Sequence, residues 1–103
     1  MDTKYDEAVE KQLAQRYLTS LRNKTLKKLK SERQAILDRI ICFELYYGEL
    51  NRDMNRAIRA ENWTDVILIR RKFRENSDDR LELIQYDSVI KEKERLKGLR
   101  VVQ

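Results

Sequence analysis

Apolar side chains alternate in steps of four and three residues through the middle of the chain. An α-helix turns once in 3.6 residues, so this spacing keeps one narrow stripe of a helix pointed at a neighbouring helix. A helix with such a stripe is not stable alone in water, so other segments of the chain are expected to cover it. We call these residues the seam: Ile36, Ile40, Phe43, Tyr47, Leu50, Met54 and Ala57.

The composition points to the same fold class. The 103 residues include no proline and two glycines, which leaves little material for tight turns or bulges. Charged residues make up 40% of the chain, but the apolar residues recur at helical spacing, which is typical of a folded protein. We therefore predict one all-α domain: an antiparallel helical hairpin or a three-to-four-helix bundle with a long central helix and coiled-coil-like packing.

The segment before the seam leaves two structures open. Periodicity predicts a helix over about residues 4–18, and it weakens over the basic segment 19–34, which is either continuous helix or a hinge. Ser31 and Gln34 have the spacing of a capping box, so a new helix can also begin between them.

The segments after the seam are marked by capping residues. Asn62 is a good N-cap, which predicts that the central helix ends near residue 60 and that the next begins at Trp63. Polar residues after Phe73 predict a break, because their side chains compete for backbone hydrogen bonds. The predicted elements are a helix over about 63–75, a helix over about 79–97 that ends near Gly98, and a frayed tail over 98–103.

Two small residues in the central helix carry expectations of their own. Gly48 costs a helix roughly 1 kcal/mol relative to alanine, so we expect another helix to approach closely there. Cys42 is the only cysteine, which excludes an intramolecular disulfide. Because it lies beside the seam, we expect a buried, unreactive thiol.

The residue types argue against an enzyme. The chain has no histidine, and it lacks a zinc-ligand set and a glycine-rich phosphate loop. Its acidic pairs lie among lysines and arginines, where carboxylates are expected to be ionised and solvated. We predict no catalytic residue, metal, cofactor or small-molecule substrate. No run of eighteen apolar residues occurs, so we expect a soluble, cytoplasmic protein without a membrane partner.

The first half of the central helix is apolar over more than one stripe. A single neighbouring helix would leave part of this surface exposed, and exposed apolar area of this kind is typical of subunit or partner interfaces. We therefore predict a small interaction or regulatory protein of the adaptor kind, which forms a homodimer or binds another protein. The candidate interface residues are Ile36, Leu37, Ile40, Ile41, Phe43, Tyr46 and Tyr47.

The basic residues suggest an alternative function. Residues 21–34 include six basic side chains and one acidic side chain, a local charge of +5. Cations on a helix can contact a phosphate backbone and release its counterions, so DNA or RNA binding is the alternative. A solvated lysine-rich face explains the same pattern, and no recognisable DNA-binding motif accompanies it. The candidate nucleic-acid residues are Arg22, Lys24, Lys27, Lys28, Lys30 and Arg33.

Overall fold

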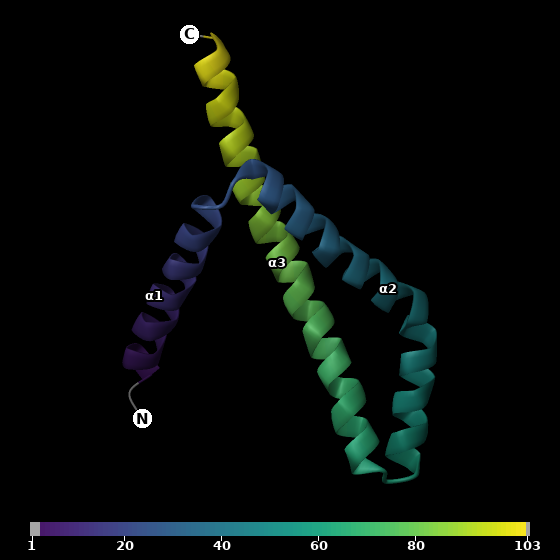
Figure 1. Ribbon diagram of the computed structural model, residues 1–103. Coiled ribbons are helices and arrows are strands. Elements are labelled where there is room, and N and C mark those ends of the chain that lie inside the picture. Colours follow the sequence, from purple (N-terminus) through teal and green to yellow (C-terminus); the bar gives the residue numbers. More distant parts are fainter. Residues whose placement is uncertain (1–2, 103) are drawn as a thin grey trace. The chain divides into compact units, whose positions relative to one another are not determined.

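The protein is all-helical over residues 3–102, which the computed structural model describes, with side chains described over 6–98 (Figure 1). The helices are α1 (Thr3–Arg22), α2 (Leu26–Arg59) and α3 (Trp63–Val102), and no strand occurs in this range. The all-α prediction is confirmed. Contacts group the chain into two compact units: one spans Arg33–Ile84, and the other combines the chain up to Glu32 with the segment from Gln85 onward. Behaviour as a single domain stays a prediction.

The link between α2 and α3 is a short, hydrogen-bonded turn. Glu61 has a φ of 55°, and the Asn62 and Glu61 amides donate to the carbonyls of Ala57 (2.9 Å) and Ile58 (3.1 Å). This is the Schellman pattern, which satisfies the last carbonyls of a helix. Asn62 then caps α3, because its Oδ1 accepts from the Asp65 amide at 3.3 Å. The predicted cap at Asn62 and helix start at Trp63 are confirmed.

The basic segment contains one break, between α1 and α2. Residues 23–25 are non-helical, and the Thr25 hydroxyl accepts from the Lys28 amide at 3.2 Å. This is the bond that an N-cap makes to the third helical residue, so Thr25 caps α2, which begins at Leu26. Of the open alternatives, the structure has a hinge before residue 26 and continuous helix beyond it, with Ser31 inside the helix.

The predicted break after Phe73 is wrong, because α3 is one helix from Trp63 to Val102. Within the Arg33–Ile84 unit, the polar run is tied to α2: Asp79 pairs with Arg39 at 3.0 Å, and Arg80 pairs with Glu44 at 3.2 Å. Such tertiary contacts override weak helix propensity. The helix also passes through Gly98 into the predicted frayed tail; only Gln103 of that tail lies outside the described residues.

The Arg33–Ile84 unit is a two-helix hairpin with a small core. Ile36, Ile40 and Ala57 of the seam are buried, whereas Phe43, Leu50 and Met54 are half-buried and Tyr47 is exposed. On α3, Val66, Ile69 and Phe73 are half-buried, and the Phe73 ring lies against the rings of Phe43 and Tyr47. The seam residues are therefore buried as predicted only near the two ends of the seam, whereas those in its middle are half-buried or exposed.

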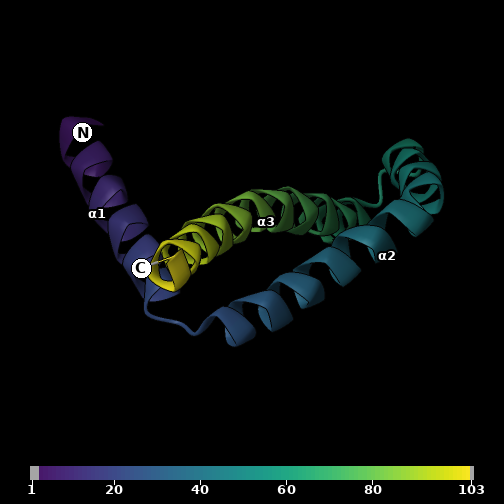
Figure 2. The ribbon, with the colours of Figure 1, turned by 90° about the horizontal axis from the view of Figure 1, so that it is seen from above.

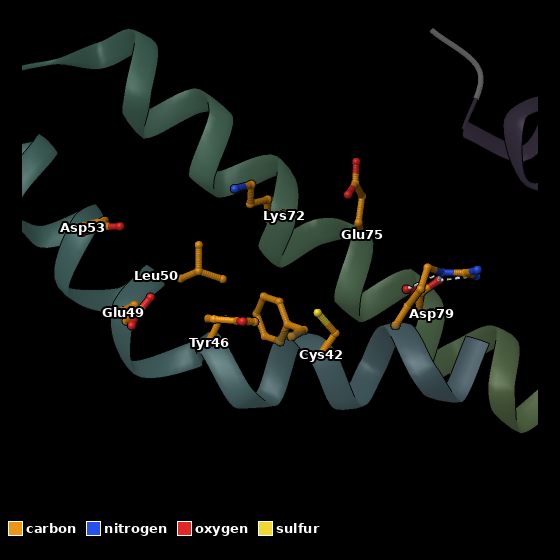
Figure 3. A pocket seen from close by; sticks show the side chains of 10 residues that line it. Cys42, Tyr46, Glu49, Leu50, Asp53, Lys72, Glu75 and Asp79 are labelled. Atoms are coloured by element: carbon orange, nitrogen blue, oxygen red, sulfur yellow. Dashed lines mark hydrogen bonds and ion pairs between the residues drawn. The ribbon is translucent and has the colours of Figure 1, made fainter. Parts of the chain in front are cut away.

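α2 bends within its length (Figures 1 and 2). Figure 3 shows the change of direction close to Tyr46 and Leu50, a stretch that includes Gly48. Glycine is a common cause of helix bends. A Cβ built on Gly48 would meet nothing within 4 Å, so the expected close helix approach is wrong.

Replacing Gly48 by alanine is therefore expected to stabilise the protein. The new methyl group meets open space, and alanine is preferred to glycine in a helix by about 1 kcal/mol. Urea unfolding followed by circular dichroism measures the change. Gly98→Ala is the matched control: its Cβ also meets nothing within 4 Å, but it lies near the end of α3 and should gain less. A destabilised Gly48→Ala variant would show instead that the bend requires glycine.

Candidate interaction surface

Three aromatic rings form the centre of the Arg33–Ile84 unit. The ring centroids of Phe43 and Phe73 are 5.4 Å apart, those of Tyr47 and Phe73 are 5.9 Å apart, and those of Phe43 and Tyr47 are 6.0 Å apart. All three pairs meet edge to face, the arrangement that the ring quadrupoles favour. We call these residues the ring cluster. Because Tyr47 is half exposed, the cluster forms both part of the hairpin packing and part of the surface.

A groove of about 460 Å³ is lined by residues of α2 and α3, Phe43 among them (Figure 3). Its α2 wall carries Cys42, Tyr46 and Leu50, and its end is closed by a two-pronged ion pair. In that pair the Arg39 Nη2 and Nε groups donate to Asp79 Oδ1 (3.0 Å) and Oδ2 (3.2 Å). Cys42 is exposed, so the expectation of a buried thiol is wrong. The lining residues are Arg39, Cys42, Phe43, Tyr46, Glu49, Leu50, Asp53, Lys72, Glu75 and Asp79.

A second groove, of about 570 Å³, borders the ring cluster. It contains the only buried polar side chain among the described residues, Asn76, and we call it the Asn76 groove. Arg80 and Glu44 meet at its surface in an ion pair of 3.2 Å, with both side chains more than half exposed. The lining residues are Phe43, Glu44, Tyr47, Phe73, Asn76, Ser77 and Arg80.

The predicted interface residues separate into two groups. Ile36 and Ile40 are buried inside the chain, and Leu37 and Phe43 are half-buried, so the first two belong to the core rather than to an accessible surface. The exposed fractions of the remaining three are 46% for Ile41, 54% for Tyr46 and 50% for Tyr47, and Leu45 reaches 76%.

Several exposed apolar residues were not anticipated from the sequence. The hairpin also exposes large apolar side chains at its turn and along α3, outside the candidate interface that the sequence predicted. These residues are Ile58, Trp63, Ile67, Leu68, Leu81 and Ile84. Two helices bury one stripe each, so residues on the other faces stay in contact with water.

The basic residues are mostly engaged within the chain. Lys24 pairs with Glu32 at 2.7 Å, Lys30 with Glu94 at 2.9 Å, and Arg22 with Glu92 at 3.5 Å. Arg33 also has an interaction partner. Lys27 and Lys28 are exposed, and neither forms an ion pair with another described side chain. Of the six basic residues that the sequence suggested for phosphate binding, two, Lys27 and Lys28, therefore carry charges that no ion pair within the described residues occupies.

Asn76 is the buried polar residue that the sequence interpretation missed. A four-three pattern along α3 joins Val66, Ile69, Phe73 and Asn76, and it would have placed this amide on the same stripe of α3 as Phe73. The sequence interpretation gave weight to the helix-breaking tendency of asparagine instead.

Among the described residues, no three His, Cys, Asp or Glu side chains are arranged to hold a metal ion. None of the helices over those residues combines the length and apolar content needed to cross a membrane. Comparisons with protein-family models, with curated proteins and with solved structures give no match.

Proposed function

We propose that the protein is a non-enzymatic interaction protein and that the Arg33–Ile84 unit is its binding module. It self-associates or binds another protein through the exposed apolar side chains of α2. The supporting observation is the exposure of Ile41, Leu45, Tyr46 and Tyr47 in a helix whose seam already packs on α3.

The energetics favour further burial of this surface. Covering apolar area contributes about 25 cal/mol per Å², and aromatic side chains are enriched where proteins meet. Tyrosine is suited to this role because its ring is apolar and its hydroxyl remains hydrogen-bonded in a wet rim. A second hairpin placed on the first would also complete a four-helix bundle, in which each helix has two neighbours.

Light scattering after size exclusion tests the proposal. The parent protein is expected to have a mass above the 12.5 kDa of one chain, or to capture a protein partner from extracts of its host. Ile41→Glu and Tyr46→Glu should each abolish that association, because an unpaired charge cannot be buried in an apolar interface.

Asn51→Glu is the matched control, since it adds the same charge to the same helix at an exposed polar position. It should leave association unchanged. A protein of 12.5 kDa at every concentration, with partner capture and solubility unaffected by Ile41→Glu and Tyr46→Glu, would refute the proposed function.

Nucleic-acid binding stays a prediction. The ion pairs of the basic residues favour it less than protein binding. Contacting phosphates with Arg22, Lys24 or Lys30 would require breaking the pairs to Glu92, Glu32 or Glu94. Because the gain from counterion release grows with the number of cations available, two unpaired lysines support only weak binding.

A further inference from the structure

A second line of side chains with four-three spacing runs along α3, on a different face of the helix from Phe73. Its members are all exposed: Trp63, Ile67, Arg70, Arg74, Ser77, Leu81 and Ile84. We call these residues the α3 stripe. It lies within the Arg33–Ile84 unit and covers about 32 Å of helix, at about 1.5 Å per residue. Four-three spacing keeps the side chains on one side of a helix, so a single partner helix can contact all of them.

Both ends of the α3 stripe are apolar and in contact with water. The exposed fractions are 58% for Trp63 and 58% for Ile67 at one end, and 62% for Leu81 and 66% for Ile84 at the other. Single exposed apolar residues are normal on a protein surface, but four of them on one helix face form two apolar patches in line. Such patches are typical of a surface that a partner covers.

The middle of the α3 stripe is basic. Arg70 and Arg74 are exposed, and neither forms an ion pair with another described side chain. Arg39 and Arg80 differ from them, because their guanidinium groups are paired with carboxylates of the same unit. The α3 stripe itself contains no carboxylate. Two free guanidinium groups between apolar patches select aspartate or glutamate, since arginine forms charge-assisted, two-pronged bonds with carboxylates.

We propose that the α3 stripe binds an amphipathic helix of another protein, whose contact face is apolar at both ends and carries aspartate or glutamate in its middle. The partner's apolar side chains pack on the two apolar ends of the stripe, and its carboxylates accept hydrogen bonds from Arg70 and Arg74. The stripe is separate from the exposed apolar side chains of α2. The inference therefore goes beyond the proposed function and does not depend on it.

A second copy of the chain fits this stripe poorly. Arg74 lies at the middle of the stripe, so an antiparallel pair of stripes brings the two copies of Arg74 together at the two-fold axis. In a parallel pair, Arg70 and Arg74 each meet their own counterpart. Like charges placed opposite each other in an interface are destabilising. The charge of the stripe therefore favours a different, acidic helix.

Three synthetic peptides of about three heptads serve as probes. All are helix-forming and carry leucine at the outer four-three positions. The acidic-centre peptide has glutamate at the two central positions of that face, and the basic-centre peptide has lysine there. The third peptide controls for net charge, because it has glutamine at the centre and the two glutamates on the opposite face. None contains tryptophan, so the emission of Trp63, the only tryptophan of the chain, should shift to shorter wavelength when a peptide covers the stripe.

The acidic-centre peptide is expected to bind the whole chain with micromolar affinity, at least about tenfold more tightly than either of the other peptides. Ile67→Glu and Leu81→Glu should each weaken its binding by about tenfold or more, because each places a charge in an apolar end of the stripe. The double variant Arg70→Glu/Arg74→Glu should reverse the preference, so that the basic-centre peptide binds more tightly.

Arg52→Glu/Arg71→Glu is the matched control for this double charge reversal. Both arginines are exposed in the same unit, and neither forms an ion pair with another described side chain. Arg52 belongs to α2, and Arg71 points about 100° around the helix from Arg70, so the preference for the acidic-centre peptide should persist. All the replaced residues are exposed, so circular dichroism should show similar melting temperatures for every variant.

Several outcomes would overturn the inference. These are equal affinity for the acidic-centre peptide and either of the others, no change in emission with any peptide, and a preference that survives Arg70→Glu/Arg74→Glu. Association of the parent protein that Ile67→Glu abolishes, without peptide binding, would show that a second copy covers the stripe. Ile41→Glu tests the proposed function and should leave peptide binding unchanged, so either idea can fail without the other.

Discussion

Leu29→Ala is expected to lower the free energy of unfolding by about 2–5 kcal/mol. Leu29 is 0% exposed, and Leu21, Val89 and Ile90 are buried in the same unit. The substitution removes three carbon atoms from this core and leaves a cavity that rigid helices cannot fully close. Because small proteins are stable by about 5–15 kcal/mol, much of the helical signal should be lost at modest urea concentrations.

The matched control for this prediction is Leu13→Ala in the same compact unit. Leu13 is 57% exposed and lies outside the proposed interaction surface, so the same truncation should change the free energy of unfolding by no more than about 0.5 kcal/mol. Urea unfolding monitored by circular dichroism compares the two variants. Equal losses of stability would contradict the buried position of Leu29.

The seam and the cap at Asn62 were predictable because each is a local sequence pattern with one physical interpretation. Ile36, Ile40 and Ala57 are buried where the four-three spacing places them, and Asn62 caps α3 as its side chain allows. The cap at Thr25 was harder to predict, because no glutamate or glutamine follows it at the third position to complete a capping box. That position is Lys28.

The continuity of α3 was not predictable from local propensity. Asn76, Ser77 and Asp78 favour turns when considered alone. In the folded chain Asp79 and Arg80 pair with Arg39 and Glu44, about forty residues earlier, and these contacts hold the helix through the polar run. Such pairs depend on the hairpin already being formed, and no short sequence window contains both partners.

The candidate site was predictable only in part, for a related reason. Sequence spacing identified a wide apolar face, but it could not divide that face between core and surface. Ile40 and Ile41 are neighbours in the chain, yet one is buried and the other exposed, because successive helical residues point about 100° apart. The unpaired amide of Asn76 required coordinates, since it is defined by the absence of an acceptor nearby.

Acidification is expected to weaken the unit that contains Glu32. The Lys24 ammonium donates to Glu32 Oε2 at 2.7 Å, and the buried Tyr86 hydroxyl donates to the same oxygen at 2.7 Å. These hydrogen bonds lower the pKa of Glu32 below its ordinary value of 4.5, and burial opposes them. A carboxylate with a lowered folded-state pKa stabilises the fold above its unfolded-state pKa, and this contribution disappears as the pH falls through the folded-state pKa.

Glu32→Gln should therefore lower the free energy of unfolding at pH 7 by about 1–2 kcal/mol, since two charge-assisted hydrogen bonds are weakened in a partly exposed site. The difference from the parent protein should shrink as the pH falls below about 4.5, where the parent's carboxylate also becomes neutral. Urea unfolding at several pH values measures both effects.

Glu94→Gln is the control for the Glu32 prediction, because its pair with Lys30 is also short, at 2.9 Å, but both side chains are about half exposed. An exposed pair of this kind is worth at most about 1 kcal/mol, so this variant should stay close to the parent at pH 7. If Glu32→Gln matched Glu94→Gln at every pH, the Lys24–Glu32–Tyr86 contacts would be no more stabilising than a surface ion pair. If instead the effect of Glu32→Gln grew on acidification, the pKa of Glu32 would be raised rather than lowered by folding.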